Sequence, residues 1–189
     1  MNGNKKNGIG RKSAMQKRRE RTKKLTLGAV MCALGVVLLY LGSVVEVLDL
    51  SMAAVASLLC VIVVIEAGGA YPWIVYVVTS VLSVILLPQK TPALFYTVFA
   101  GYYPILKEKF ERMSRGISYG LKFAVFNIAA VITVVIDFLL LAPQAFPGVP
   151  LIIGGAVVLN AVFALYDFAL TRLISAYIFR FRSKFKFFK

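Results

Sequence analysis

Six long apolar stretches fill most of the chain after residue 24, and they limit its fold more than any other feature. The hydrocarbon core of a bilayer is about 30 Å thick, and a helix needs about 17–25 residues to cross it. Residues 50–65 and 91–106 lie at or just below that lower limit, so a buried helix of a soluble protein is the alternative for these two. Four clearer neighbours favour membrane spans for both. The six stretches are residues 25–45, 50–65, 70–87, 91–106, 123–142 and 151–171.

Helices explain these stretches better than the strands of a membrane barrel. Barrel strands alternate apolar and polar residues over about 10 positions, whereas residues 36–39 are continuously apolar. Backbone groups inside a bilayer must be satisfied within the chain, which a helix bundle achieves. The composition agrees, because 60% of the residues are hydrophobic and only 16% are charged, against about 25% charged in soluble domains. The sequence therefore predicts an all-α membrane protein with a compact six-helix transmembrane bundle.

The basic residues predict the orientation of this bundle. The net charge is +14, and 21 of the 22 lysines and arginines fall on one side of a six-span topology, with Lys90 alone on the other. Cytoplasmic loops of membrane proteins carry such an excess, so both termini are expected in the cytoplasm. The prediction divides the chain into a basic cytoplasmic tail (1–24), flexible or helical from Met15 onward, the transmembrane domain (25–179) and a basic, aromatic tail (180–189).

The two basic tails are expected to contact anionic lipids rather than nucleic acid. Each basic residue near an anionic membrane surface contributes about 1 kcal/mol. Nucleic-acid binding favours aromatic side chains beside the charges, and residues 1–24 contain none. Residues 179–189 do alternate Phe with Lys and Arg, but after a membrane span this pattern is typical of an interfacial amphipathic segment.

Several kinds of chemistry are excluded by residues or motifs that the chain lacks. It contains no histidine, so histidine-based catalytic triads and metal sites are ruled out. Its two cysteines, Cys32 and Cys60, both lie in apolar stretches and are expected to be packing residues. The sequence has no P-loop and no hydrolase motif. We therefore expect no enzymatic activity, no cofactor and no metal ion.

Two aspartates and one asparagine lie within the predicted spans. An ionisable residue inside a membrane is costly and suggests function. Asp137 lies near the outer end of the fifth span, and Asp167 lies near the middle of the sixth. Asn160 precedes Asp167 by seven residues, nearly two helical turns, so the two side chains should share a stripe facing the bundle interior. Such a stripe either lines a path for a solute or ion or forms interhelical hydrogen bonds.

Three further candidate site residues come from the predicted outer side. Glu46 and Asp49 flank the turn between the first two spans, and Tyr96 lies toward the outer end of the fourth span. Together they are candidates for the rim of a solute pocket. Solvated turn charges and an aromatic residue of the core or interface are the structural alternatives.

The first predicted span resembles that of a known transporter family. Residues 23–34 read KKLTLGAVMCAL, which places a basic segment before a helix with Ala29 and Ala33 one turn apart. Small residues allow close approach of another helix. This segment, the chain length and the six-span topology resemble the substrate-binding S components of energy-coupling factor (ECF) transporters.

The resemblance implies a function, partners and a location. The chain would capture a small, vitamin-like solute from outside a bacterial plasma membrane. Ala29 and Ala33 would dock onto a transmembrane coupling subunit that is powered by two ATPase subunits. Glu46, Asp49, Tyr96, Asp137, Asn160 and Asp167 are the solute-contact candidates. A stand-alone ion-coupled transporter, with Asp137 and Asp167 as carriers, and a non-transporting envelope scaffold remain alternatives, while an intramembrane protease finds no supporting motif.

Overall fold

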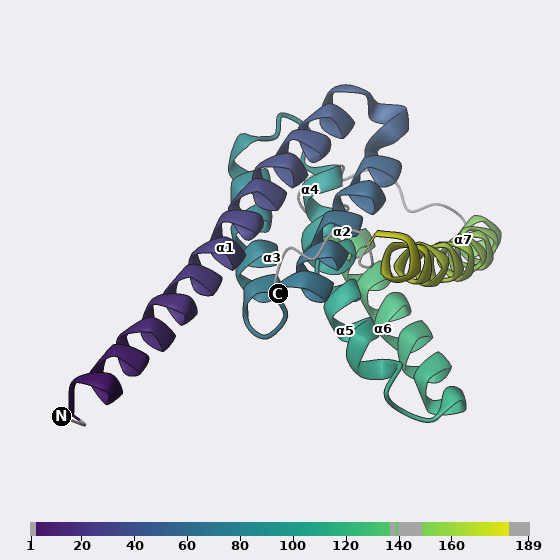
Figure 1. Ribbon diagram of the computed structural model, residues 1–189. Coiled ribbons are helices and arrows are strands. Elements are labelled where there is room, and N and C mark those ends of the chain that lie inside the picture. The colour runs from purple at the N-terminus through teal and green to yellow at the C-terminus, as the bar shows by residue number, and fades with distance from the viewer. Residues whose placement is uncertain (1–2, 137–138, 140–148, 182–189) are drawn as a thin grey trace.

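The computed structural model describes residues 3–136, 139 and 149–181, and within these residues the chain is helical and has no strands (Figure 1). These described residues form six consecutive helical segments, as the six apolar stretches predicted. The segments are α1 (Gly3–Val44), α2 (Asp49–Glu66), α3 (Tyr71–Leu86), the interrupted segment of α4 (Thr91–Phe95), η2 (Tyr96–Ala100) and α5 (Tyr103–Phe110), then α6 (Arg115–Ile136), and α7 (Val149–Ala176) with η4 (Tyr177–Phe181); the short 3₁₀ turn η1 (Glu46–Leu48) joins α1 to α2.

Four of these helices are long and apolar enough to cross a membrane. Their candidate spans have mean hydropathies between 1.7 and 2.2 and cover Ala14–Val44, Asp49–Glu66, Gly116–Ile136 and Gly154–Phe179. Helix α3 is apolar but has only 16 residues. The fourth predicted span is present as α4, η2 and α5, so no single one of these helices has the length of a span.

The breaks between the helices contain residues suited to turns. Gly68 and Gly69, which follow α2, have φ values of 60° and 62°, in the left-handed region that glycine adopts without steric cost. Pro72 and Pro92 lie in the first turns of α3 and α4, where the missing N–H of proline is not needed. These residues therefore account for the helix boundaries before α3 and α4.

Helix α1 extends through the basic tail instead of beginning at the first span. It starts at Gly3, earlier than the Met15 considered from sequence, and its N-terminal part projects beyond the other helices in Figure 1. Close to the first span, the Lys24 ammonium donates a hydrogen bond to the carbonyl oxygen of Ala67 at a distance of 2.8 Å. This contact places the start of the first span beside the end of α2.

Small residues on one face of α1 allow close packing against α3. Gly28 and Gly35 are buried, and a Cβ atom at these positions would lie 3.1 Å from Val75 and 3.3 Å from Thr79. Between them, Cys32 accepts a hydrogen bond from the Thr79 hydroxyl at 3.3 Å. A Cβ atom at either position would require Val75 or Thr79 to shift, so this face of α1 packs against α3.

The interrupted segment provides the aromatic centre of the core. Tyr96, Phe99 and Tyr103 are spaced along it and are at most 2% exposed. Gly101 directly follows the π-helix η2, and a Cβ atom there would come within 2.6 Å of Tyr76 and 2.7 Å of Tyr96. Only a glycine lets these two tyrosine rings occupy their positions.

Helices α6 and α7 are less enclosed than α1 and α2. In the most apolar window of each helix, 33% of the residues are buried in α1 and in α2, compared with 17% in α6 and 11% in α7. In Figure 1 the α6 and α7 ribbons diverge on the side away from α1. Hydrogen bonds and ion pairs between α6 and α7 therefore contribute much of the contact that holds these two helices together.

Candidate functional site

Asp167 of α7 is the centre of a buried group of polar side chains. Asp167 is 9% exposed. The Tyr103 hydroxyl donates a hydrogen bond to Oδ1 at 2.6 Å, and the Lys122 ammonium lies 3.1 Å from Oδ2. The Lys107 ammonium pairs with Oδ1 as well. Asp167 thus joins α5, α6 and α7 through both carboxylate oxygens.

A second carboxylate completes what we call the ionic cluster: Lys107, Glu111, Lys122 and Asp167. Glu111 lies 3.1 Å from the Lys107 ammonium and 3.4 Å from that of Lys122. Two positive charges therefore face two negative charges. Lys107 is only 1% exposed, and a buried charge of this kind is tolerated only when it is paired and hydrogen-bonded. The cluster is electrically balanced within itself.

The sequence does not predict the contacts of these two lysines. It places Lys107 and Lys122 among the cytoplasmic charges that orient the bundle and makes neither a site candidate. The structure adds that both point into the protein and neutralise Asp167. Helix α6 starts at Arg115, before the apolar stretch, so Lys122 lies seven residues inside the helix. This position within the helix was the sequence signal that could have indicated a lysine facing the protein.

Asn160 and Asp167 share one face of α7, as their seven-residue spacing predicted, and that face meets α6. The amides of Asn160 and Asn127 exchange two hydrogen bonds of 2.9 and 3.1 Å. Lys122, five residues before Asn127, reaches Asp167. Two polar contacts therefore connect α6 and α7 along this stripe.

A small cavity with aromatic walls lies between α2, the interrupted segment, α6 and α7. We call it the aromatic cavity, and its volume is about 200 Å³. Phe126 and Phe163 stack in its wall with centroids 4.4 Å apart and planes inclined by 7°. Ser51 and Tyr166 bring the hydroxyl groups. The lining residues are Leu50, Ser51, Ala54, Phe95, Phe99, Phe126, Leu159, Val162, Phe163 and Tyr166.

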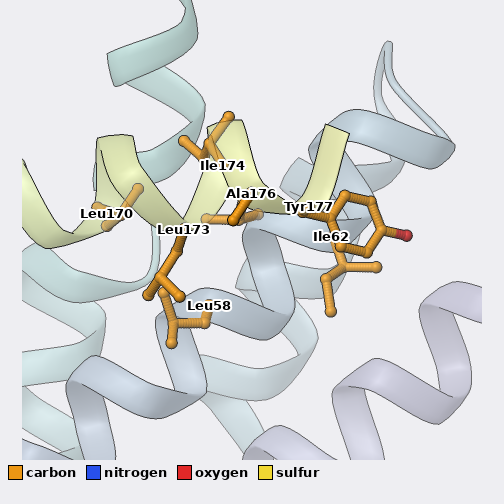
Figure 2. Close-up of a pocket in the computed structure, with 8 residues that line it drawn as sticks. Leu58, Ile62, Leu170, Leu173, Ile174, Ala176 and Tyr177 are labelled. Carbon is orange, nitrogen blue, oxygen red and sulfur yellow. The ribbon is translucent and has the colours of Figure 1, made fainter. Parts of the chain in front are cut away.

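Helix α7 and the adjoining η4 contact α2 through two side-chain hydroxyl groups, with cavities beside them. Tyr166 and Ser57 share a hydrogen bond of 2.6 Å, and Tyr177 donates one to Glu66 at 3.2 Å. Between these contacts is a second apolar cavity of about 210 Å³, the α2–α7 cavity. Figure 2 shows Leu58 and Ile62 of α2 beside Leu173 and Tyr177 of the last helix. The interface between α2 and α7 is therefore incompletely packed.

The remaining predicted site residues do not gather around one cavity. Asp49 begins α2 directly before Leu50, and the backbone of Glu46 begins η1. Tyr96 is 1% exposed within the aromatic core. Asp137 lies outside the described residues. Among the described side chains, none of the six solute candidates lines the aromatic cavity, although Asp49 immediately precedes Leu50 and Asn160 immediately follows Leu159, which both do.

Ala29 and Ala33 lie on the exposed side of α1. Their neighbours Gly28 and Cys32 are buried against α3, so the small residues of this helix divide between two faces. Val30 and Leu34, rotated by one position, are 50% and 47% exposed. A one-turn pair of alanines is thus available to another helix.

Comparisons with protein-family models, curated proteins and solved structures find no match to this chain. Within the described residues, no group of histidine, cysteine or acidic side chains is arranged to hold a metal ion. Cys32 and Cys60 are both buried free thiols. The polar chemistry of this part of the chain is concentrated in the ionic cluster and the asparagine pair.

Proposed function

We propose that the chain is the solute-binding membrane subunit of an ECF-type uptake transporter and catalyses no reaction itself. In this proposal six spans cross a bacterial plasma membrane with both termini in the cytoplasm. The basic end of the bundle, with Lys24, Lys107 and Arg172, faces the cytoplasm because of the excess of positive charge there. The end with Glu46 and Lys90 faces outward.

The observation that carries this proposal is the position of the aromatic cavity. It runs from Leu50 in the first turn of α2 to Tyr166 near the middle of α7. It therefore occupies the half of the bundle that faces outward in this topology. The ionic cluster lies beyond Tyr166 toward the basic end. A solute arriving from outside would reach the aromatic cavity first, and the ionic cluster would lie between this cavity and the cytoplasm.

The cavity wall suggests the kind of solute. Phe95, Phe99, Phe126 and Phe163 surround the space, and such faces favour flat, apolar or aromatic molecules. Its volume is below the roughly 300–1,000 Å³ of cavities that hold drug-sized ligands. The hydroxyls of Ser51 and Tyr166 supply a few polar contacts. We propose a small, uncharged ring compound, with Asp49 and Asn160 near its path.

The exposed alanine pair supports the proposed partners. Ala29 and Ala33 would dock onto a transmembrane coupling subunit, which connects the chain to two ATPase subunits. Docking near the basic end leaves the aromatic cavity accessible from the other end. Helix α7, held to α2 by few contacts, would be the wall that moves when the solute is released.

A second candidate function is a stand-alone ion-coupled transporter. The observation that favours it is the ionic cluster. An intramembrane aspartate is a typical proton or cation carrier. However, Lys107 and Lys122 already neutralise Asp167, which favours a structural role for it. We therefore place this candidate second.

Docking is tested by Ala29→Trp combined with Ala33→Trp in the full-length protein. We expect loss of uptake and of co-purifying coupling and ATPase subunits, while solute is still retained. The matched control is Val30→Trp with Leu34→Trp on the adjacent exposed face. This double variant should keep both uptake and the co-purifying subunits. Unchanged uptake in the alanine double variant would defeat the docking proposal.

The cavity is tested separately by Ala54→Trp, which fills it from α2. Solutes retained by the purified protein are identified by mass spectrometry. We expect the retained solute to disappear in this variant and to remain in Val55→Trp, because Val55 is 43% exposed and does not line the cavity. Retention by both variants would place the solute elsewhere.

A further inference from the structure

A larger, polar cavity lies at the basic end of α6 and α7, on the other side of Tyr166 from the aromatic cavity. This polar cavity has a volume of about 540 Å³. Its walls come from the turn after α5, the first two turns of α6 and the last turns of α7. Its polar lining consists of Glu111, Ser118, Tyr119, Lys122, Asp167, Thr171, Arg172 and Ser175.

The charges around the polar cavity do not cancel. Glu111 and Asp167 are matched by Lys107 and Lys122 within the ionic cluster. Arg172 adds a further positive charge, and its guanidinium lies over the Phe168 ring at 5.2 Å. No carboxylate of the described residues lies within ion-pair distance of it. The site is one negative charge short of neutrality.

The depth of the cavity indicates where that negative charge comes from. Ser118, Tyr119 and Lys122 lie in the first turns of the candidate span Gly116–Ile136, and Arg172 lies near the end of Gly154–Phe179. In the six-span topology proposed above, these residues lie toward the cytoplasmic ends of their spans, which places the mouth of the cavity near the lipid headgroups. Basic pockets between helices at this level recognise anionic lipids.

The mouth of the cavity suits a lipid more than a free ion. Met113, Tyr119 and Phe168 are 47%, 60% and 58% exposed, and apolar surface of this kind can cover the glycerol and upper acyl chain. The hydroxyls of Ser118 and Tyr119 can donate to phosphate oxygens. We propose that the polar cavity binds the phosphodiester headgroup of one monoanionic phospholipid, with Arg172 as its principal contact.

The binding is tested with the full-length protein in detergent by native mass spectrometry during titration with phosphatidylglycerol or phosphatidylcholine. We expect one phosphatidylglycerol to bind at least about ten-fold more tightly than phosphatidylcholine. Arg172→Gln should remove this preference. Arg112→Gln is the matched control, because Arg112 pairs with exposed Glu108 outside the cavity. Loss of its charge should weaken lipid binding by at most about five-fold, which is the effect of diffuse electrostatic attraction to one basic residue.

A second variant separates position from charge. Ser175→Trp fills the cavity without changing the net charge and should also remove the preference. Melting temperatures without added lipid identify any variant that fails to fold. Equal losses in Arg172→Gln and Arg112→Gln, or unchanged binding in Ser175→Trp, would overturn the site. Inorganic phosphate that stabilises the parent protein but not Arg172→Gln, with no lipid preference, would assign the cavity to a free phosphate instead.

Discussion

The Lys122 ammonium of α6 lies 3.1 Å from Oδ2 of Asp167 in α7, and this pair connects the two least enclosed of the four candidate spans. The Lys107 ammonium pairs with the other carboxylate oxygen of Asp167. Removing the negative charge of Asp167 therefore leaves two ammonium groups in a buried site with Glu111 as the remaining carboxylate of the ionic cluster.

Asp167→Asn is expected to destabilise the protein strongly. Removing one partner of a buried ion pair typically costs about 3–5 kcal/mol, since the other charge stays buried without compensation. The measurement is the melting temperature of the purified protein in detergent. Glu108→Gln is the control, because Glu108 and Arg112 form an exposed pair, and such pairs contribute about 0–1 kcal/mol.

The same variant separates two roles for Asp167. A shift in melting temperature as small as that of Glu108→Gln would show that the ionic cluster does not stabilise the fold. If transport then stopped in a fully stable Asp167→Asn protein, the ion-coupled alternative would gain support over the solute-binding subunit.

The sequence predicted the helices well because their signals are local. Apolar runs, Gly68-Gly69 and the prolines in the first turns of α3 and α4 set the boundaries without reference to the rest of the chain. The stripe of Asn160 and Asp167 was also predictable from helical spacing, and both residues do face α6.

The site was less predictable because its members come from distant parts of the chain. Lys107 and Asp167 are 60 residues apart, and a lysine near a helix end looks the same in sequence whether it faces water or a carboxylate. The aromatic cavity likewise depends on how four helical segments meet. The π-helix η2, which places Tyr96 in the core, has no signal in the residues that form it.

Gly101→Ala is expected to destabilise the bundle, because the new methyl group would collide with Tyr76 and Tyr96. Overpacking of this kind costs about 1–3 kcal/mol. Gly120→Ala in α6 is the matched control: nothing lies within 4 Å of a Cβ there, and alanine favours a helix by about 1 kcal/mol over glycine. Thermal unfolding should shift in opposite directions for the two variants, and a shared direction would contradict the packing at η2.

The asparagine pair between α6 and α7 should show energetic coupling. Asn127→Leu or Asn160→Leu alone leaves one amide without its partner, at a cost of about 1–2 kcal/mol. The double variant should lose less than the sum of the two single variants, because no amide then remains unpaired. A double-mutant cycle of unfolding free energies measures this coupling, and strict additivity would mean that the two amides act independently.

Tyr166→Phe is expected to loosen α7 without unfolding the rest of the chain. The Ser57 hydroxyl already donates to the Ala54 carbonyl oxygen at 2.6 Å, so Tyr166 is the donor in the hydrogen bond that they share. Its removal costs about 0.5–1.5 kcal/mol, and it acts between two cavities where few other contacts hold α7 to α2. Amide hydrogen exchange should therefore accelerate in α7 and stay unchanged in α1. Tyr40→Phe on the exposed side of α1 should leave both rates unaltered, and equal acceleration in all helices would show that Tyr166 supports the whole bundle rather than this one interface.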